Sequence, residues 1–276
     1  MTALASATQH ATGSHPAADQ PDEARAVGAR KITPYLLLIP GLAWLVLFFI
    51  VPMVQLAVVS LESKFPGYPG YYYLDLAVWN YRDALSEFWP HIIRSFVFAG
   101  VATILAFIIG YPLAYAMAFK AGKWRNVMMI LVIAPFFTSF ILRTIAWRQI
   151  LADEGPVAST LNALHLLPGG HITETWVAVV AGLTYNFLPF MTLPMSMPGV
   201  LAGTLMTFIP ASGDYVNAEL LGSDISTKMV GNAIESQFFR VPGGYPTAAA
   251  LSFTLMAIIL VMLFAYTRKF GTENLL

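Results

Sequence analysis

The sequence contains no cysteine and few charged residues. Charged side chains make up 11% of its 276 residues, whereas hydrophobic ones make up 57%. The lack of cysteine excludes disulfides, thiolate metal sites and a cysteine nucleophile. A soluble domain carries about 25% charged residues, so this chain lacks the polar surface that contact with water requires. The composition therefore predicts a protein that is embedded in a membrane.

An excess of charge of one sign is also missing, because 15 basic residues balance 15 acidic ones. Nothing in this balance points to a nucleic-acid partner. The P-loop, the H-E-x-x-H zinc motif, the G-x-S-x-G elbow and the EF-hand loop are all absent. We therefore expect no enzyme activity, no metal site, no cofactor and no ATP-binding site in the chain itself.

The first 30 residues are rich in Ala, Thr, His, Pro and Asp and have no apolar core. A signal peptide needs a basic start and an apolar region of about 7–15 residues, so this segment is not one. Its composition is typical of disorder. We expect a disordered cytoplasmic tail over residues 1–30, followed by a transmembrane domain over residues 31–272.

A membrane-spanning helix needs about 20 predominantly apolar residues. Five stretches meet this requirement: Ile32–Leu61, His91–Phe119, Val127–Leu151, Trp176–Pro210 and Thr247–Thr267. The fourth is longer than one crossing requires. The number of crossings therefore depends on whether this stretch spans the membrane once or twice.

Lys and Arg accumulate on the cytoplasmic side of membrane proteins. Here they precede the first stretch, separate the second from the third and follow the last, at Arg25, Arg30, Lys31, Lys120, Lys123, Arg125, Arg268 and Lys269. Residues 152–175 contain neither, as an outside loop should. Both termini are then cytoplasmic, which requires an even number of crossings.

We therefore predict an all-α polytopic protein with six transmembrane helices, in which Trp176–Pro210 crosses twice. The fourth and fifth helices would form a strained hairpin that turns at Pro194, Pro198 and Gly199. If this stretch crossed only once, everything after Asp214 would invert. The basic residues at the C-terminus would then lie outside, against the charge rule.

The predicted outside loop Glu62–Pro90 is rich in aromatic residues: Phe65, Tyr68, Tyr71, Tyr72, Tyr73, Trp79, Tyr81, Phe88 and Trp89. Tyr and Trp favour the boundary between membrane and water, and a belt at this boundary is the preferred interpretation. An aromatic cage for a cationic ligand is the alternative.

Polar residues inside apolar helices are costly and are therefore candidates for function. Arg143 lies in the outer half of the third stretch, where it either snorkels toward the outer interface or faces a partner helix or an aqueous path. Tyr185 and Asn186 lie in the fourth helix. They either form hydrogen bonds between helices or line a translocation pathway.

A second group of candidates, Asp214, Tyr215 and Glu219, follows Pro210 at the outer end of the fifth helix. Charges at such a position are either solvated loop residues or a negative outer gate. A gate of this kind would attract a cationic substrate, because low-dielectric walls focus the electrostatic field.

Four segments carry a resemblance to a known family: GYPLAYAMA (Gly110–Ala118), LRTIAW (Leu142–Trp147), SMPGVLAGTLMTFIPASGDYVNAELLG (Ser196–Gly222) and MVGNAIESQF (Met229–Phe238). They resemble the permease subunits of type I ABC importers, specifically those of spermidine/putrescine systems. The resemblance implies a bacterial inner-membrane subunit that translocates polyamines. It also implies three kinds of partner: a second permease, cytoplasmic ATPases that bind the ATP, and an extracytoplasmic substrate-binding protein.

The chain departs from this family in one place. Such permeases carry a cytoplasmic E-A-A-x-x-x-G loop between the fourth and fifth helices, which docks into the ATPase. Here Leu188–Pro194 runs directly into Met195–Gly199 without that pattern. We therefore hypothesise a shortened permease whose coupling to ATP hydrolysis is damaged or lost. A non-functional remnant is one alternative. A stand-alone secondary transporter or channel is another, and it would need intramembrane carboxylates or a repeated half.

Overall fold

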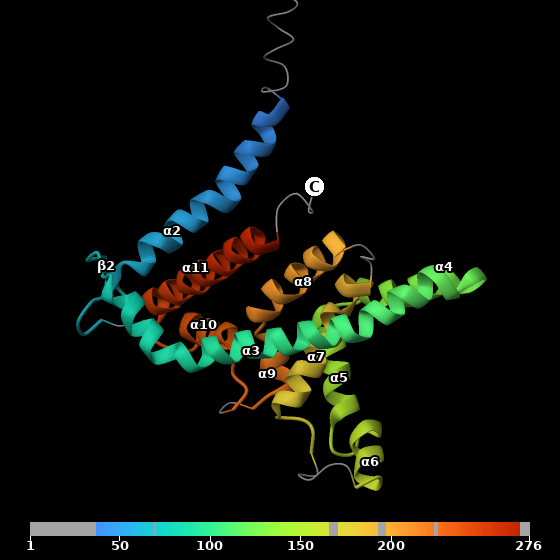
Figure 1. Cartoon of the computed structure of the whole chain (residues 1–276). Coiled ribbons are helices and arrows are strands. Elements are labelled where there is room, and N and C mark those ends of the chain that lie inside the picture. Colours follow the sequence, from blue (N-terminus) through green and yellow to red (C-terminus); the bar gives the residue numbers. More distant parts are fainter. Residues whose placement is uncertain (1–36, 69, 166–170, 193–196, 224–225, 271–276) are drawn as a thin grey trace, which may run out of the picture. The chain divides into compact units, whose positions relative to one another are not determined.

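The computed structural model describes residues 37–68, 70–165, 171–192, 197–223 and 226–270 (Figure 1). Nearly all regular structure in these ranges is helical. The predicted tail, residues 1–30, lies outside them. Contacts along the chain divide it into a unit that ends at Val54 and a second unit that begins at Gln55.

The first predicted span is a helix from Leu37 to Ser60. Within it, a π-helical stretch η1 (Val46–Ile50) is followed by α2 (Val51–Ser60). The side chains of residues 37–52 are exposed, although almost all are apolar. A helix of 24 residues is long enough to cross a bilayer, and these side chains suit a surface that faces lipid.

A short antiparallel hairpin follows, formed by β1 (Glu62–Lys64) and β2 (Tyr72–Leu74). It occupies the first part of the predicted outside loop. The last part of that loop is helical, because α3 (Trp79–Tyr115) begins before the predicted start at His91.

The helix α3 continues as η2 (Ala116–Lys120) and is the longest helix of the described residues. It packs against α7 (Trp176–Thr192), α8 (Met197–Ser212), α10 (Val230–Phe239) and α11 (Tyr245–Phe270). Small residues recur on its buried face every three or four positions, at Ser95, Ala99, Ala102, Thr103, Ala106, Gly110 and Ala114. Small side chains let helix backbones approach closely inside a membrane, so this stripe explains why α3 has so many neighbours.

The third predicted span is not one continuous helix, which corrects the expectation for Val127–Leu151. The chain forms η3 (Gly122–Trp124), α4 (Arg125–Ile133) and η4 (Ala134–Phe137), and then α5 (Phe140–Leu151) and α6 (Pro156–Ala163). The two halves meet at an angle of 102°. Pro135 has no N–H to donate, and the extended backbone at Thr138 ends the helix there.

The fourth stretch forms two helices, α7 and α8, which pack against each other. They have 17 and 16 residues. At 1.5 Å per residue each is about 25 Å long, shorter than the hydrocarbon layer of about 30 Å. The turn predicted at Pro194 lies outside the described residues, whereas Pro198 and Gly199 belong to the first turn of α8.

The prediction of an all-α polytopic membrane protein is confirmed. Among the described residues, three helices are long and apolar enough to cross a membrane: Leu37–Ser60, Trp79–Lys120 and Tyr245–Lys269. The bent pair that contains α4 and α5 is a fourth candidate, and α7 and α8 are shorter apolar helices. Six apolar segments are therefore present, and that all six cross the membrane stays a prediction.

Candidate functional site

Four of the six polar candidates lie at or near α9 (Val216–Leu221), a short helix between α8 and α10. In the first turn of α9, Asn217 is fully buried. Its backbone N–H donates to Oδ1 of Asp214 at 2.8 Å, and its side-chain Nδ2 donates to Oδ2 of the same carboxylate at 2.9 Å. Both carboxylate oxygens of Asp214 are thereby held by one residue.

The other side of the Asn217 amide connects to two more helices. Its Oδ1 accepts from Nδ2 of Asn186 on α7 at 3.1 Å and from Oγ1 of Thr144 on α5 at 3.4 Å. Asn186 Nδ2 also lies 3.4 Å from Thr144 Oγ1. We call Thr144, Asn186, Asp214 and Asn217 the buried amide network. All four are buried, and together they join α5, α7 and the segment around α9.

Glycines allow this network to form. A Cβ added at Gly182 on α7 would lie 2.7 Å from Oδ1 of Asn217 and would also collide with Leu221. A Cβ at Gly231 on α10 would lie 2.5 Å from the backbone oxygen of Gly213. These separations are too short for a real Cβ atom. The absence of a side chain at Gly182 and Gly231 therefore allows α7 and α10 to approach the α9 segment closely.

One acceptor of the network has no hydrogen-bond donor among the described residues. It is Oδ1 of Asn186, on a side chain that is 1% exposed. An unpaired buried polar atom costs about 1–3 kcal/mol.

Asp214 is 8% exposed and lies just beyond the end of α8. Burial raises the pKa of its carboxyl above the usual value of 3.8, and the hydrogen bonds from Asn217 oppose this rise. The buried carboxylate has no cation within ion-pair distance among the described residues. Its charge is compensated by amide dipoles alone.

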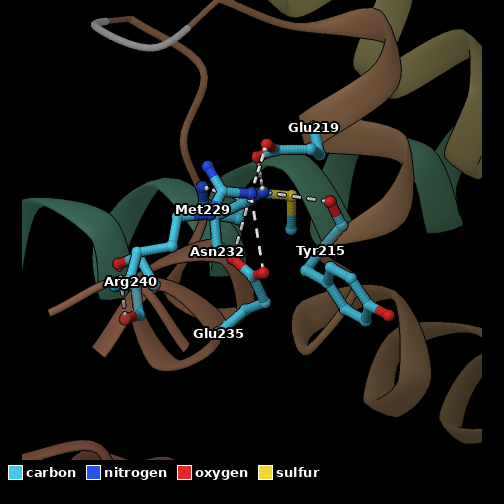
Figure 2. A network of polar contacts seen from close by, with 8 residues as sticks. Tyr215, Glu219, Met229, Asn232, Glu235 and Arg240 are labelled. Atoms are coloured by element: carbon cyan, nitrogen blue, oxygen red, sulfur yellow. Dashed lines mark hydrogen bonds and ion pairs between the residues drawn. The ribbon is translucent and has the colours of Figure 1, made fainter. Parts of the chain in front are cut away.

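A second polar group lies on the other side of α9 (Figure 2). Asn232 of α10 donates through Nδ2 to the backbone oxygen of Tyr215 at 3.0 Å and to Oε2 of Glu219 at 3.1 Å. Its Oδ1 accepts from the backbone N–H of Met229 at 3.1 Å, which satisfies the start of α10.

Glu219 also forms an ion pair with Arg240 beyond the end of α10, at 2.8 Å. Arg240 makes a second pair with Glu235 at 3.3 Å. The hydrogen bond and charge of Glu219 raise the pKa of Arg240 above its usual value. We call Glu219, Asn232, Glu235 and Arg240 the charged clasp, because it fastens α9 to both ends of α10. The carboxylate of Glu219, a candidate for a charge at the outer gate, is thus paired with Arg240.

The remaining candidates lie outside both groups. The guanidinium carbon of Arg143 lies 5.6 Å and 5.7 Å from the ring centroids of Phe136 and Phe140, and its Nε is buried without a hydrogen-bond partner among the described residues. The ring of Tyr185 packs against Trp147 at 5.2 Å. The structure therefore brings Asn186 and Asp214 together, but it does not place Arg143 or Tyr185 with them.

Sequence reasoning missed five residues of these groups. Thr144 and Asn217 belong to the buried amide network, and Asn232, Glu235 and Arg240 belong to the charged clasp. All of them except Arg240 lie inside a motif segment that carries the family resemblance. A polar residue inside an apolar motif was the available signal, but helix pairing had to be known before it indicated a contact.

A polar cavity of about 260 Å³ adjoins the charged clasp. It is lined by Arg148, Ala152, Asp153, Thr173, Glu174, Glu219, Leu220 and Gly222. Three of these residues are acidic and one, Arg148, is basic, so the lining of the cavity is acidic overall. Among the described residues, no group of three or more His, Asp or Glu side chains is placed to hold a metal ion.

No protein-family profile matches the chain. It is 27% identical to the spermidine/putrescine transport system permease protein PotB of Haemophilus influenzae, over 82% of this chain and 90% of that protein. It is 26% identical to PotB of Escherichia coli, over 82% and 93% respectively. It is also 26% identical to the inner membrane ABC transporter permease protein YdcU of E. coli, over 67% and 72%. These similarities confirm the resemblance that the motifs indicate.

The alignment with the Haemophilus protein extends over 261 residues, yet 82% of the 276 residues of this chain amounts to about 226. About 35 positions of the alignment therefore have no counterpart in this chain.

Proposed function

We propose that this chain, a homologue of spermidine/putrescine transport permeases, is the membrane-spanning permease subunit of an ATP-driven polyamine importer. The observation that carries the proposal is the similarity to PotB proteins over 90% or more of their length. A second permease, cytoplasmic ATPases and an extracytoplasmic binding protein would complete the importer. ATP would be bound by the ATPase subunits.

In the proposed topology, six helices cross the bacterial inner membrane and the N-terminus is cytoplasmic. The α9 segment and the hairpin β1–β2 then lie at the outer end. The basic loop that contains Lys120, Lys123 and Arg125 lies at the inner end, as the positive-inside rule requires.

The buried amide network and the acidic cavity suit an outer gate for a cationic substrate. A polyamine carries several ammonium groups, each a strong hydrogen-bond donor. The cavity offers carboxylates at Asp153 and Glu174, and the network offers the unpaired Oδ1 of Asn186. Arg143 and Tyr185 would line the pathway apart from this gate.

We further propose that this chain is a shortened form that has lost its docking element for the ATPase. Only residues 193–196 separate α7 from α8, about one helical turn. A Cβ at Gly110 of α3 would lie 3.0 Å from Cβ of Met191, so α7 ends beside Gly110. Lys120, the last residue of η2, lies ten residues beyond Gly110, about 15 Å at the helical rise.

The described part of α7 therefore ends before the level of the basic inner loop. Four residues are too few for a segment that must project into the cytoplasm to contact an ATPase. The alignment positions without a counterpart in this chain support the same proposal, because about 35 residues is ample for a loop with a helix.

The test is co-purification with the ATPase subunit encoded nearby, together with uptake of radiolabelled spermidine by the assembled transporter. Three forms are compared: the chain as it stands, a form with an E-A-A loop reinserted after Pro194, and a form with a Gly/Ser loop of equal length at the same place. We expect only the E-A-A form to capture the ATPase and support uptake. Capture by the unmodified chain would overturn the loss of docking. If the E-A-A form captures the ATPase but does not take up spermidine, the assignment of spermidine as a substrate is wrong.

A further inference from the structure

The hairpin between the first helix and α3 presents aromatic rings on one of its faces. Tyr73 pairs with Ser63 in the register of the two strands. The backbone N–H of Phe65 donates to the oxygen of Tyr71 at 2.9 Å, which extends the ladder by one pair. Side chains alternate between the faces of a strand, so Phe65, Tyr71 and Tyr73 share the face of Ser63.

These rings, together with Tyr68 and with Tyr72 from the other face, line an open cavity of about 390 Å³ whose lining is entirely aromatic. The rings of Phe65 and Tyr73 meet edge to face, with centroids 6.0 Å apart and planes at 82°. Tyr68 and Tyr71 do the same at 6.3 Å and 84°. Rings in this arrangement form walls and do not close over each other as a stack would.

The rings are not part of the packed core. Phe65 is 50% exposed, Tyr68 63%, Tyr71 69% and Tyr73 42%. Their electron-rich faces are therefore accessible from outside the protein. Aromatic faces of this kind attract cations, and cages of several rings bind organic ammonium groups.

The charges around the cavity have the sign that a cation requires. Asp75 follows Tyr73 by two residues and lies on the same face, where its Oδ2 accepts from Oγ of Ser63 at 3.1 Å. The basic residue of the hairpin, Lys64, shares the opposite face with Tyr72, and its side-chain carbons lie next to Gly243. None of the residues that line the cavity is basic.

The same features argue against a metal ion. Ca²⁺ and Mg²⁺ need several oxygen ligands that converge on one point. No cluster of three metal-binding side chains occurs here or elsewhere in the described ranges. One carboxylate beside several aromatic faces fits an alkylammonium group, which needs a single counter-charge and a soft apolar surface.

We propose that this aromatic cavity, with Asp75 beside it, binds the ammonium end of a linear amine before the amine enters the translocation pathway. The inference rests on the proposed function, which places the hairpin on the outer side and makes a polyamine the substrate. The ethanolamine headgroup of a phospholipid offers the same ammonium chemistry, and the experiment separates the two sources.

The experiment measures binding of radiolabelled spermidine to the full chain, purified in a non-ionic maltoside detergent, by equilibrium dialysis. We expect Tyr71→Leu to weaken binding about five-fold or more, since one cation–π contact is lost. Tyr71→Phe keeps the ring face and should bind as the unmodified chain does. Asp75→Asn should weaken binding as well. Trp89→Leu removes an aromatic side chain that is 50% exposed on α3, outside the cavity, and should leave binding unchanged.

Equal binding by the unmodified chain and Tyr71→Leu would overturn the inference, and so would an equal loss in Trp89→Leu. Competition identifies the natural source of the ammonium. Displacement of spermidine by glycerophosphoethanolamine, but not by glycerophosphoglycerol, would assign the site to lipid headgroups and overturn the role in capture. Resistance to both supports free polyamine.

This inference can fail independently of the proposed function. If the transporter with the reinserted loop takes up spermidine, but the isolated chain shows no binding that depends on Tyr71, the proposed function stands and the capture site does not. If neither uptake nor binding occurs, both fail together.

Discussion

Replacement of Asn217 by alanine tests whether the buried amide network holds the helices together. The substitution removes the donor at 2.9 Å from the Asp214 carboxylate, but the backbone N–H at 2.8 Å remains. A hydrogen bond to a charged group contributes about 1.5–3 kcal/mol. The Asn217→Ala substitution also removes the acceptor that Asn186 contacts at 3.1 Å. An unpaired buried amide costs about 1–3 kcal/mol.

The two losses are not fully additive, because water that enters the space left by Asn217 would form hydrogen bonds with both the Asp214 carboxylate and the Asn186 amide. We therefore expect a destabilisation of about 2–4 kcal/mol, within the range for breaking a buried polar network. For a domain of this size, each kcal/mol lowers the unfolding midpoint by roughly 2–4 °C. The assay is thermal unfolding of the purified chain in detergent, and Ser86→Ala is the control because its hydroxyl is exposed and bonds only locally.

A double-mutant cycle separates the network from general packing. Residues in one hydrogen-bond network show coupling energies of about 0.5–3 kcal/mol, whereas independent sites add. Asn186→Ala and Asn217→Ala should therefore be less damaging together than the sum of their separate effects. Strict additivity, or a midpoint shift no larger than that of the control, would refute the reasoning.

Three further predictions follow from the same contacts. Burial raises the pKa of Asp214 above 3.8, so its folded state binds the proton more tightly and loses stability as pH rises through the folded pKa. The unfolding midpoint of the unmodified chain, measured relative to that of Asp214→Asn, should therefore decrease as the pH rises above 3.8, and a constant difference would contradict this. Gly182→Ala should destabilise the chain by about 1–3 kcal/mol, because its Cβ would lie 2.7 Å from Asn217; thermal unfolding measures it, and an unchanged midpoint would show that α7 can move away. Arg240→Gln should release α9 from the end of α10 by removing the 2.8 Å pair with Glu219. Faster amide hydrogen exchange in α9 with little change in midpoint is expected, since exposed ion pairs contribute at most about 1 kcal/mol, and unchanged exchange would contradict the clasp.

The sequence was sufficient to predict the membrane class and most of the helices, because apolar length and the distribution of Lys and Arg are local properties of the chain. It failed at Val127–Leu151. Pro135 lies inside this stretch, but membrane helices tolerate proline, so a proline alone does not indicate a break. The structure bends there by 102°, because the extended residues after Pro135 add a second break that proline alone would not cause.

The site was predictable only in part. Asn186 and Asp214 stood out as polar residues at the ends or interiors of apolar helices, and both belong to the buried amide network. Their link, Asn217, lies 31 positions from Asn186 and becomes a partner only when α7 and α9 pack together. Gly182 allows that packing, but a glycine in a membrane helix gives no indication of which residue will approach it.

The two polar groups act on α9 from opposite sides. Asn217 fixes it to α5 and α7, whereas Glu219, two residues later, fixes it to α10. Because α9 has only six residues, it cannot shift without breaking one of the two sets of contacts. This segment is therefore the element at which opening of the proposed outer gate would have to begin.

The proposed deletion lies at the far end of α7 and α8 from this element. The backbone N–H of Val230 donates to Oγ of Ser95 on α3, whereas Met191 contacts α3 at Gly110, about 22 Å further along the helix. Loss of a loop beyond Met191 removes none of the contacts that hold α9. A chain of this kind can thus keep a complete outer gate while it lacks the connection to its energy source, so restoring the missing loop should restore transport without any change at the gate.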